Sequence, residues 1–446
     1  MDFLYRPDGR RLGLKIFLGK AKMKLFAEKD APFLLCKSDR ILMFIMFFSY
    51  FFFYGLLNLN FFLEIPTGIP SGLMRLTTFG IAGYFILKDY SNGEYPRMTA
   101  SIICLGIFLM YYLCVFILDE NVFGANVDVS TGRSMQRGKL EVAYLFFISS
   151  LSYFLIFFAG RKRMAYVLNN PSLIYIPSLL SVLIIIATNM RAFGTLDLYQ
   201  TYLYDFGDVR RAAIIGPVMN LIMISPYLMF FSKNRLCNFF WGPLGCAAAL
   251  SCVLISDSRT TIVTVFLVLA FYAVVSIRHV YSTVYALVVY VAGAALFIPY
   301  LVISKAFDRV MKLESILDYN LTDNDQLSRI GLIRDGISQF FDSPIIGGHI
   351  YLIGGGYSHC TPVTIMYSTG LVGISLILVA VGGIIKGAFA IREIFREKCI
   401  WIFALAVVDI CGMMINGDTM AFFCGSFSAF LMANAFASDR GRATSR

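Results

Sequence analysis

The chain has 446 residues, of which 58% are hydrophobic and only 15% are charged. A soluble domain of this composition would have far too little polar surface, and the mean hydropathy of +0.72 points the same way. The net charge of +10 would suggest nucleic acid in a soluble protein, but much of it lies where we expect anionic lipid headgroups, so nucleic-acid binding is not predicted. The composition therefore predicts a polytopic membrane protein.

A helix that spans a membrane needs about 20 mainly apolar residues. Apolar runs of about this length fill most of the chain. In chain order they cover residues 41–62, 72–87, 99–118, 140–159, 172–190, 212–231, 238–255, 260–276, 284–304, 362–385, 399–415 and 419–437. The sequence thus predicts an all-α polytopic membrane protein with about twelve transmembrane helices, in which residues 41–437 form one domain. A basic, amphipathic cytoplasmic segment, residues 1–40, precedes this domain, and a cytoplasmic tail, residues 438–446, follows it.

The distribution of lysine and arginine predicts the orientation of these helices, since both residues resist translocation. If residues 1–40 are cytoplasmic, the alternate loops on that side contain most of the cations, and the basic C-terminal tail falls there too. These loops contain Arg161, Lys162, Arg163, Lys233, Arg235, Arg278 and the cations between Lys386 and Lys398. We therefore expect both termini in the cytoplasm and four loops outside, namely 119–139, 191–211, 256–259 and 305–361.

No sequence pattern indicates a metal or redox centre. Most cysteines lie within predicted spans, where cysteine behaves as a small apolar residue, and no CxxC spacing occurs. Asp323-Asn324-Asp325 has the spacing of a metal-binding DxD motif, but such a stretch is also typical of a solvated turn, which we favour. We predict no required metal and no cofactor.

The outer loop 305–361 is the longest polar interruption of the chain. Helical spacing of apolar residues predicts an amphipathic helix over Leu327–Phe341, lying against the bilayer or the bundle. Its apolar stripe consists of Ile330, Ile333, Ile337 and Phe341. Arg329 and Arg334 flank this stripe, so their guanidinium groups would lie at headgroup height. There they could bind a lipid-linked phosphate; the alternative is that they only extend to bulk headgroups.

Glycine- and proline-rich turns follow this helix and contain His349 and His359. His359 comes after a run of glycines and stands at the entry of the next predicted span. A histidine with an ordinary pKa near 6.5 can take or share a proton at neutral pH. A lone histidine is more often structural, but two arginines in the same outer loop favour a functional role for His359.

Four motifs in this region follow one another in a recognisable order: Ser328-Arg329, Asp342-Ser343-Pro344-Ile345-Ile346-Gly347-Gly348, Ser358-His359-Cys360 and Thr369-Gly370-Leu371-Val372-Gly373. This order resembles the O-antigen polymerase and O-antigen ligase superfamily of bacterial integral membrane glycosyltransferases. Cys360 stands where that family usually has asparagine. Two upstream stretches fit the same resemblance, Arg210-Arg211 followed by Ile215-Gly216-Pro217 and Asn220, and Ser256-Asp257-Ser258-Arg259. The resemblance extends over residues 210–375.

The resemblance implies a fold like that of the GT-C glycosyltransferases, with a large periplasmic loop, in the bacterial inner membrane. It implies inverting, metal-independent transfer from an undecaprenyl-pyrophosphate-linked oligosaccharide, which serves as both donor and acceptor. His359 and Arg329 would be catalytic, and the pyrophosphate would be bound by Arg210, Arg211, Arg259 and Arg334. A polymerase is favoured over a ligase that transfers the glycan to lipid A core. Membrane lipids, a chain-length regulator and a flippase would be partners.

Arg75 is a secondary candidate, because it lies inside a predicted span, where a charge usually faces a cavity or a partner. The alternative is a shifted span that places Arg75 at the interface. A lipid-linked oligosaccharide flippase or another transporter is the rival class, since its span count and basic inner loops would look the same. Transporters place their polar residues near the bilayer midplane, however, whereas the richest polar set here is in an outer loop.

Overall fold

The computed structural model describes residues 35–63, 68–93, 99–119, 161–193, 207–232, 234–256, 259–276, 329–353, 358, 360–395, 400–404 and 407–408. Within these residues the fold is all-α, without a strand. The helices are α2 (Lys37–Leu63), α3 (Gly68–Ser91), α4 (Ala100–Leu118), α6 (Arg161–Asn169), α7 (Ser172–Phe193), α9 (Gly207–Phe231), the π-helical turn η2 (Cys237–Trp241), α10 (Gly242–Ser256), α11 (Arg259–Ser276), α15 (Arg329–Asp342) and α16 (Thr361–Phe395).

Eight of the predicted spans coincide with a described helix, from α2 at 41–62 to α16 at 362–385. The runs 140–159, 284–304 and 419–437 lie outside the described residues, as do the segments 1–34 and 438–446. The sequence shows why these stretches are helical. α4, for example, is an almost uninterrupted apolar run that Thr99 caps, with its Oγ1 accepting a hydrogen bond from the backbone N–H of Ile102.

Two helices of the described residues are long and apolar enough to cross a membrane, Ala100–Leu118 and Thr361–Arg392. A third would be added if Lys162–Asn169 and Ser172–Thr188, which meet at a bend of 56°, form one span. The shorter helices Gly216–Phe231 and Thr264–Val275 are also apolar. These residues support membrane-helix character, but they do not support the predicted number of about twelve spans.

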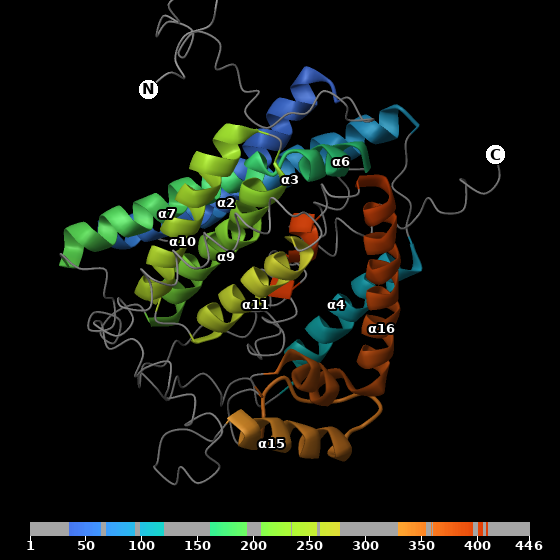
Figure 1. Cartoon of the computed structure of the whole chain (residues 1–446). Helices are drawn as coiled ribbons and strands as arrows, with labels where there is room; N and C mark the ends of the chain where they lie inside the picture. Colours follow the sequence, from blue (N-terminus) through green and yellow to red (C-terminus); the bar gives the residue numbers. More distant parts are fainter. Residues whose placement is uncertain are drawn as a thin grey trace, which may run out of the picture.

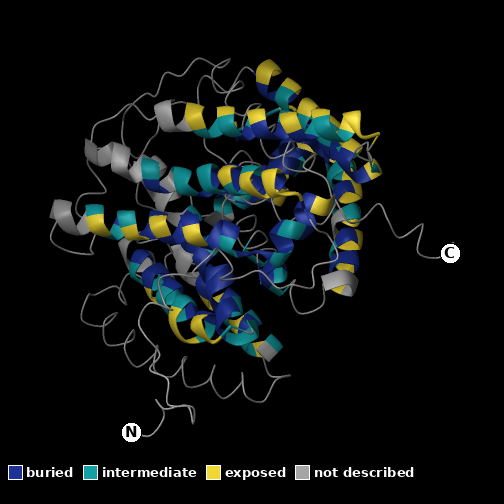
Figure 2. Ribbon diagram, turned by 90° about the horizontal axis from the view of Figure 1, so that it is seen from above, coloured by how far each residue is buried: buried dark blue, intermediate teal, exposed yellow. Residues whose placement is uncertain are grey.

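The helices pack in two groups that share one hydrophobic core. In the first, α2 lies against α7 and α3, while α9 packs against α7, α10 and α11. In the second, α16 packs along α4, and α15 lies across their lower ends in Figure 1. The exposed residues of the helices face outward, and the buried ones face the centre of the molecule (Figure 2).

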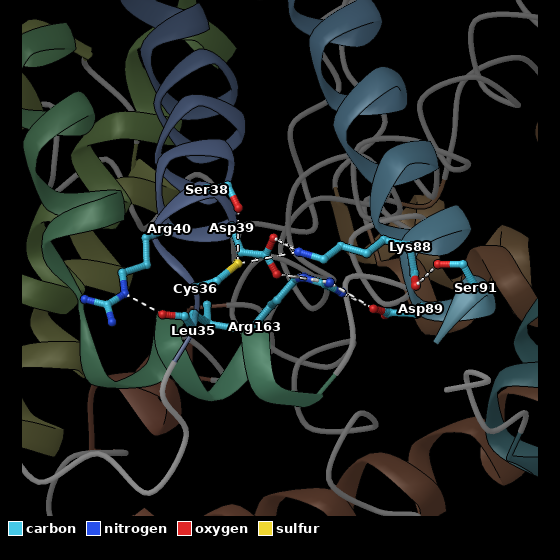
Figure 3. Close-up of polar contacts among 9 residues, drawn as sticks. All are labelled: Leu35, Cys36, Ser38, Asp39, Arg40, Lys88, Asp89, Ser91 and Arg163. Atoms are coloured by element: carbon cyan, nitrogen blue, oxygen red, sulfur yellow. Dashed lines mark hydrogen bonds and ion pairs between the residues drawn. The ribbon is translucent and has the colours of Figure 1, made fainter. Parts of the chain in front are cut away.

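An ionic cluster of Asp39, Lys88, Asp89 and Arg163 joins α2, α3 and α6 at one end of the molecule (Figure 3). Asp39 and Arg163 are buried, whereas Lys88 and Asp89 are partly exposed. Lys88 Nζ lies 2.6 Å from Asp39 Oδ1, and Arg163 donates to Asp39 Oδ2 from both Nε and a terminal nitrogen. Arg163 also donates to both carboxylate oxygens of Asp89, at 2.7 and 2.9 Å. Its guanidinium stacks over the Phe85 ring, with Cζ 4.1 Å from the ring centroid. One arginine thus connects three helices.

Charge pairing sets the ionisation of this cluster. Burial disfavours the charged form of Asp39, but the hydrogen bond from Lys88 and the charge of Arg163 outweigh it, so the pKa of Asp39 is lowered. The hydrogen bond to Asp39 raises the pKa of Lys88. Both groups are therefore held in their charged forms around neutral pH.

The loop regions of the second group lie at the opposite end from this cluster. In Figure 1, α6 is at the top, whereas α15 and the lower ends of α4 and α16 are at the bottom. The chain returns to the α6 end after α16, where Trp401 Nε1 donates to the carbonyl of Leu168. The predicted outer loops at 119 and 329–353 thus share one end of the molecule.

Candidate functional site

The candidate site is built on α15 and the first half of α16, which pack face to face. Leu332 and Phe340 of α15 form a small core with Val363 and Tyr367 of α16. The two helices approach closely at Gly336, where an added Cβ would lie 2.7 Å from Val363 Cγ1. This core fixes the helix that begins at Arg329 against α16, the candidate span that follows the loop.

Two motifs of the sequence are in direct contact: the turn at residues 344–347, Pro-hydrophobic-hydrophobic-Gly, and residues 370–373 of α16, Gly-hydrophobic-hydrophobic-Gly. The backbone N–H groups of Leu371 and Val372 donate to the carbonyls of Pro344 and Ile345, at 2.8 and 3.1 Å. Gly370 interrupts the helical geometry of α16 with φ 60° and ψ −161°, which leaves these N–H groups available to the turn. The two motifs, which begin at Pro344 and Gly370, thus form a single structural feature.

Glycine is required at both contacts. Gly347 and Gly370 have φ of 67° and 60°, in the left-handed region. A Cβ on Gly370 would lie 2.5 Å from the Ile345 carbonyl oxygen, and one on Gly347 would collide with the backbone of Ser368. The turn is closed internally as well, since Gly347 N–H donates to the Ser343 carbonyl and the Ser343 hydroxyl donates to the Gly347 carbonyl.

Asp119 and His349 meet directly beyond this turn. Asp119 is the residue after α4, and its side chain is 0% exposed, whereas the His349 side chain is 39% exposed. His349 Nδ1 lies 3.1 Å from Asp119 Oδ1, and the backbone N–H of Ile350 donates to Oδ2 at 2.7 Å. A carboxylate in this position selects the imidazole tautomer with a proton on Nδ1 and orients the ring.

Gln339 fixes the next stretch of the loop to α15. Its amide nitrogen donates to the Tyr351 carbonyl at 3.1 Å, and its amide oxygen accepts from the Ile353 N–H at 3.0 Å. The hydroxyl of Tyr367 donates to the Ile350 carbonyl. Further along, the buried Ser358 hydroxyl contacts the Cys360 carbonyl and the Thr364 hydroxyl at the start of α16. Side chains of both helices therefore hold the loop on each side of His359.

The structure places four of the predicted site residues at or near helix starts. Arg329 is the first residue of α15, Arg259 is the first of α11, and Arg210 and Arg211 lie near the start of α9. The side chains of these four arginines lie outside the described residues, and so does His359. Arg334 is exposed on α15, and Arg75 is partly exposed on α3.

Asp119 and His349 were not among the predicted site residues. One signal for Asp119 is in the sequence: a carboxylate at the C-terminal end of an apolar helix is unfavourable next to the negative end of the helix dipole. Such a residue needs a partner, but the sequence does not say which one. No group of three or more potential metal ligands occurs among the described residues.

Comparison with known proteins adds no relative. The chain matches no protein-family profile and no curated protein. Functional inference therefore depends on the motifs and their geometry.

Proposed function

We propose that this protein is an O-antigen polymerase, which joins polyprenyl-pyrophosphate-linked oligosaccharide repeat units at the periplasmic face of the bacterial inner membrane. The observation that carries the proposal is the interlock of the 344–347 turn with residues 370–372, beside the Asp119–His349 pair. Two motifs that define the resemblance are in contact, and the loop between them contains His359. This arrangement supports a structural role for the two motifs, with the polar loop as the reactive part.

The proposed chemistry is a single in-line displacement. A hydroxyl oxygen of the acceptor sugar attacks the anomeric carbon of the donor while the bond to the pyrophosphate oxygen breaks. The electron pair of that bond leaves with the pyrophosphate, and the hydroxyl proton passes to His359. The anomeric configuration inverts because only one displacement occurs.

Arginines supply the charge that this leaving group needs. The departing pyrophosphate gains negative charge, and guanidinium groups bind phosphate oxygens bidentately while keeping their own charge at biological pH. We assign the main contact to Arg329, at the start of α15, with Arg210, Arg211, Arg259 and Arg334 as further pyrophosphate ligands. No metal ion is required in this scheme.

The topology proposed with this function has about twelve spans and cytoplasmic termini. The α15 end of the molecule then faces the periplasm, and the ionic cluster faces the cytoplasm. The basic residues of α6 support this orientation, since Arg161, Lys162 and Arg163 all lie at the cluster end.

The test uses cells that lack the native gene and express wild type, Arg329→Ala, His359→Ala or His279→Ala, with protein levels checked by blot. His279 is a matched control, because it is the remaining histidine besides His349 and His359 and is predicted to lie on the cytoplasmic side. We expect a polysaccharide ladder from wild type and His279→Ala, and a single core-linked repeat unit from the other two variants.

Other outcomes distinguish the alternatives. Loss of all core-linked units while lipid-linked polymer accumulates would indicate a ligase. Loss of repeat units from the outer leaflet, without any change in glycosidic bond formation by extracts, would indicate a flippase. A full ladder from both Arg329→Ala and His359→Ala would rule out the catalytic assignment.

A further inference from the structure

The end of α15 and the following turn expose large apolar side chains. Phe341 is 71% exposed, Ile345 64% and Ile346 59%. The side of α15 that faces the bundle is formed instead by Leu332, Gly336, Gln339 and Phe340. A turn on an aqueous surface would leave these three apolar side chains in water, which is unfavourable.

This apolar surface continues onto the two helices that could cross a membrane. The turn lies between them, since Tyr111 of α4 donates its hydroxyl proton to the Ile346 carbonyl and α16 donates to Pro344 and Ile345. Ile107 and Met110 of α4 and Leu371 of α16 are themselves exposed. The turn therefore continues the exposed apolar surface of both candidate spans.

The length of α4 places the turn inside the hydrocarbon layer. α4 has 19 residues, so it extends about 28 Å, close to the roughly 30 Å thickness of the layer. Asp119 ends this helix and marks one boundary. Tyr111 is eight residues earlier, about 12 Å along the axis, and it holds Ile346.

The length of α16 independently places the turn inside the hydrocarbon layer. Its apolar stretch from Leu371 to Ile385 ends at Lys386 and extends only about 22 Å. About 8 Å of a 30 Å hydrocarbon layer must then lie beyond Leu371. Leu371 is the residue to which Pro344 is hydrogen-bonded, so the turn lies within this remaining depth.

The hydrogen bonds of the turn suit a site without water. Every carbonyl from Ser343 to Gly347 accepts a hydrogen bond from the protein, and their donors are Gly347 N, Leu371 N, Val372 N, the Tyr111 hydroxyl and the Ser343 hydroxyl, in that order. Surface turns leave such carbonyls to water, whereas irregular backbone at membrane depth must be satisfied by protein. Pro344 also removes one N–H that would need a partner.

We infer that residues 343–347 form a re-entrant turn, which enters the outer half of the bilayer after α15, exposes Ile345 and Ile346 to lipid acyl chains, and returns to the surface at His349. Asp342, the exposed last residue of α15, then lies at the headgroup boundary, beside the exposed Phe341. The partner of this surface is the bilayer itself. The turn anchors the outer loop at a fixed height, so that Asp119 and His349 lie at the level of the headgroups. This inference does not depend on the proposed enzymatic function.

The test is photocrosslinking to lipid. p-Benzoylphenylalanine is incorporated at Phe341 or Ile346, and the full-length protein is placed in vesicles of phosphatidylethanolamine and phosphatidylglycerol, illuminated and analysed by intact mass. Leu378, exposed in the middle of α16, is the lipid-facing control, and Asp335, exposed on α15, is the aqueous control. We expect an added mass of one phospholipid at positions 341, 346 and 378, and none at 335.

Adduct yields at 341 and 346 as low as the yield at 335 would overturn the inference. A crosslinked dimer at these positions, instead of a lipid adduct, would mean that a second copy of the chain covers the surface. Both substituted side chains are exposed, and the aromatic label at position 341 retains the ring that contacts Phe340 edge-on. Melting curves of each variant establish that it is folded before illumination.

Discussion

At the scale of single residues, the Asp119 carboxylate is strongly constrained at the α15 end of the molecule. It lies at the negative end of the α4 dipole and is fully buried, so two adverse terms act on its charge. His349 and the Ile350 N–H offset these terms by donating to both oxygens. Since Asp119 is a fixed point of the loop, its loss should release the segment that precedes His359.

We expect Asp119→Ala to destabilise the protein more than His349→Ala does. The first change leaves the buried Ile350 N–H without its acceptor, at a cost of about 1–3 kcal/mol, while the second removes one hydrogen bond to a charged group. Thermal melting in detergent micelles measures this order, and limited proteolysis should show faster cleavage after residue 353 in both variants. Equal melting temperatures for Asp119→Ala and wild type would contradict this account.

The ionic cluster makes a separate prediction about pH. The pKa of Asp39 is lowered, so its contribution to stability is present above its ordinary value of 3.8 and is lost as the pH falls through the lowered value. The pKa of Lys88 is raised, so its contribution is present below 10.5 and is lost as the pH rises through the raised value. The melting temperature of wild type should thus fall outside this window.

Asp39→Asn isolates the acid part of this effect. Its melting temperature should be lower than that of wild type at neutral pH, and the difference should shrink as the pH falls below 3.8. Other carboxylates titrate in the same range in both proteins, so the difference between the two curves is the relevant quantity. A difference that stays constant with pH would show that the charge of Asp39 is not involved.

At the scale of structural elements, the interlock of the turn with α16 depends on glycine at specific positions. Gly347→Ala should destabilise by about 2 kcal/mol or more, because it adds the cost of a left-handed residue to a collision with the backbone of Ser368. Gly348→Ala is the matched control, since a Cβ there meets nothing within 4 Å. Denaturation in mixed micelles gives both values, and similar losses for the two variants would exclude the interlock.

The sequence predicts these elements better than it predicts their contacts. The helix predicted over 327–341 is observed as Arg329–Asp342, because apolar spacing and the following Pro344 determine its extent. The apolar stripe of this helix is predicted to lie against either the bilayer or the bundle. Ile337 and Phe341 of the stripe are exposed, so for these two residues contact with the bundle is wrong. Lipid is as apolar as a protein core, so hydrophobic periodicity cannot say which of the two a membrane helix faces.

Contacts between residues far apart in the chain could not be predicted from the sequence. Asp119 pairs with a histidine 230 positions later, and Arg163 pairs with residues of α2 and α3. Nothing in local spacing specifies such partners, because they depend on how the helices are arranged. The turn at 344–347 was predictable from proline and glycine, but its hydrogen bonds to residues 371 and 372 required the positive φ of Gly370, which the sequence only permits.

At the scale of the whole molecule, two fixed centres lie at opposite ends of the bundle. The ionic cluster joins α2, α3 and α6, while the interlock joins α15 and its turn to α4 and α16. Neither centre shares a residue with the other. Each centre thus fixes a different end of the described bundle.

Double-mutant cycles test whether the centres are independent. Arg163→Gln removes one partner of the buried Arg163–Asp39 pair, for which breaking costs at most about 3–5 kcal/mol. Asp39 keeps Lys88 as a partner and Asp89 is partly exposed, so the loss should lie below that limit. Combined with Asp39→Asn, Arg163→Gln should cost less than the sum of the single changes, since each variant already loses the same ion pair. When Arg163→Gln is combined with Gly347→Ala, the loss of unfolding free energy should equal the sum of the two single losses to within about 0.5 kcal/mol. The two residues lie at opposite ends and share no partner. Unfolding free energies in mixed micelles give both couplings. A large coupling between Arg163 and Gly347 would mean that the bundle transmits strain from the cluster to the outer loop, and that the two ends act as one unit.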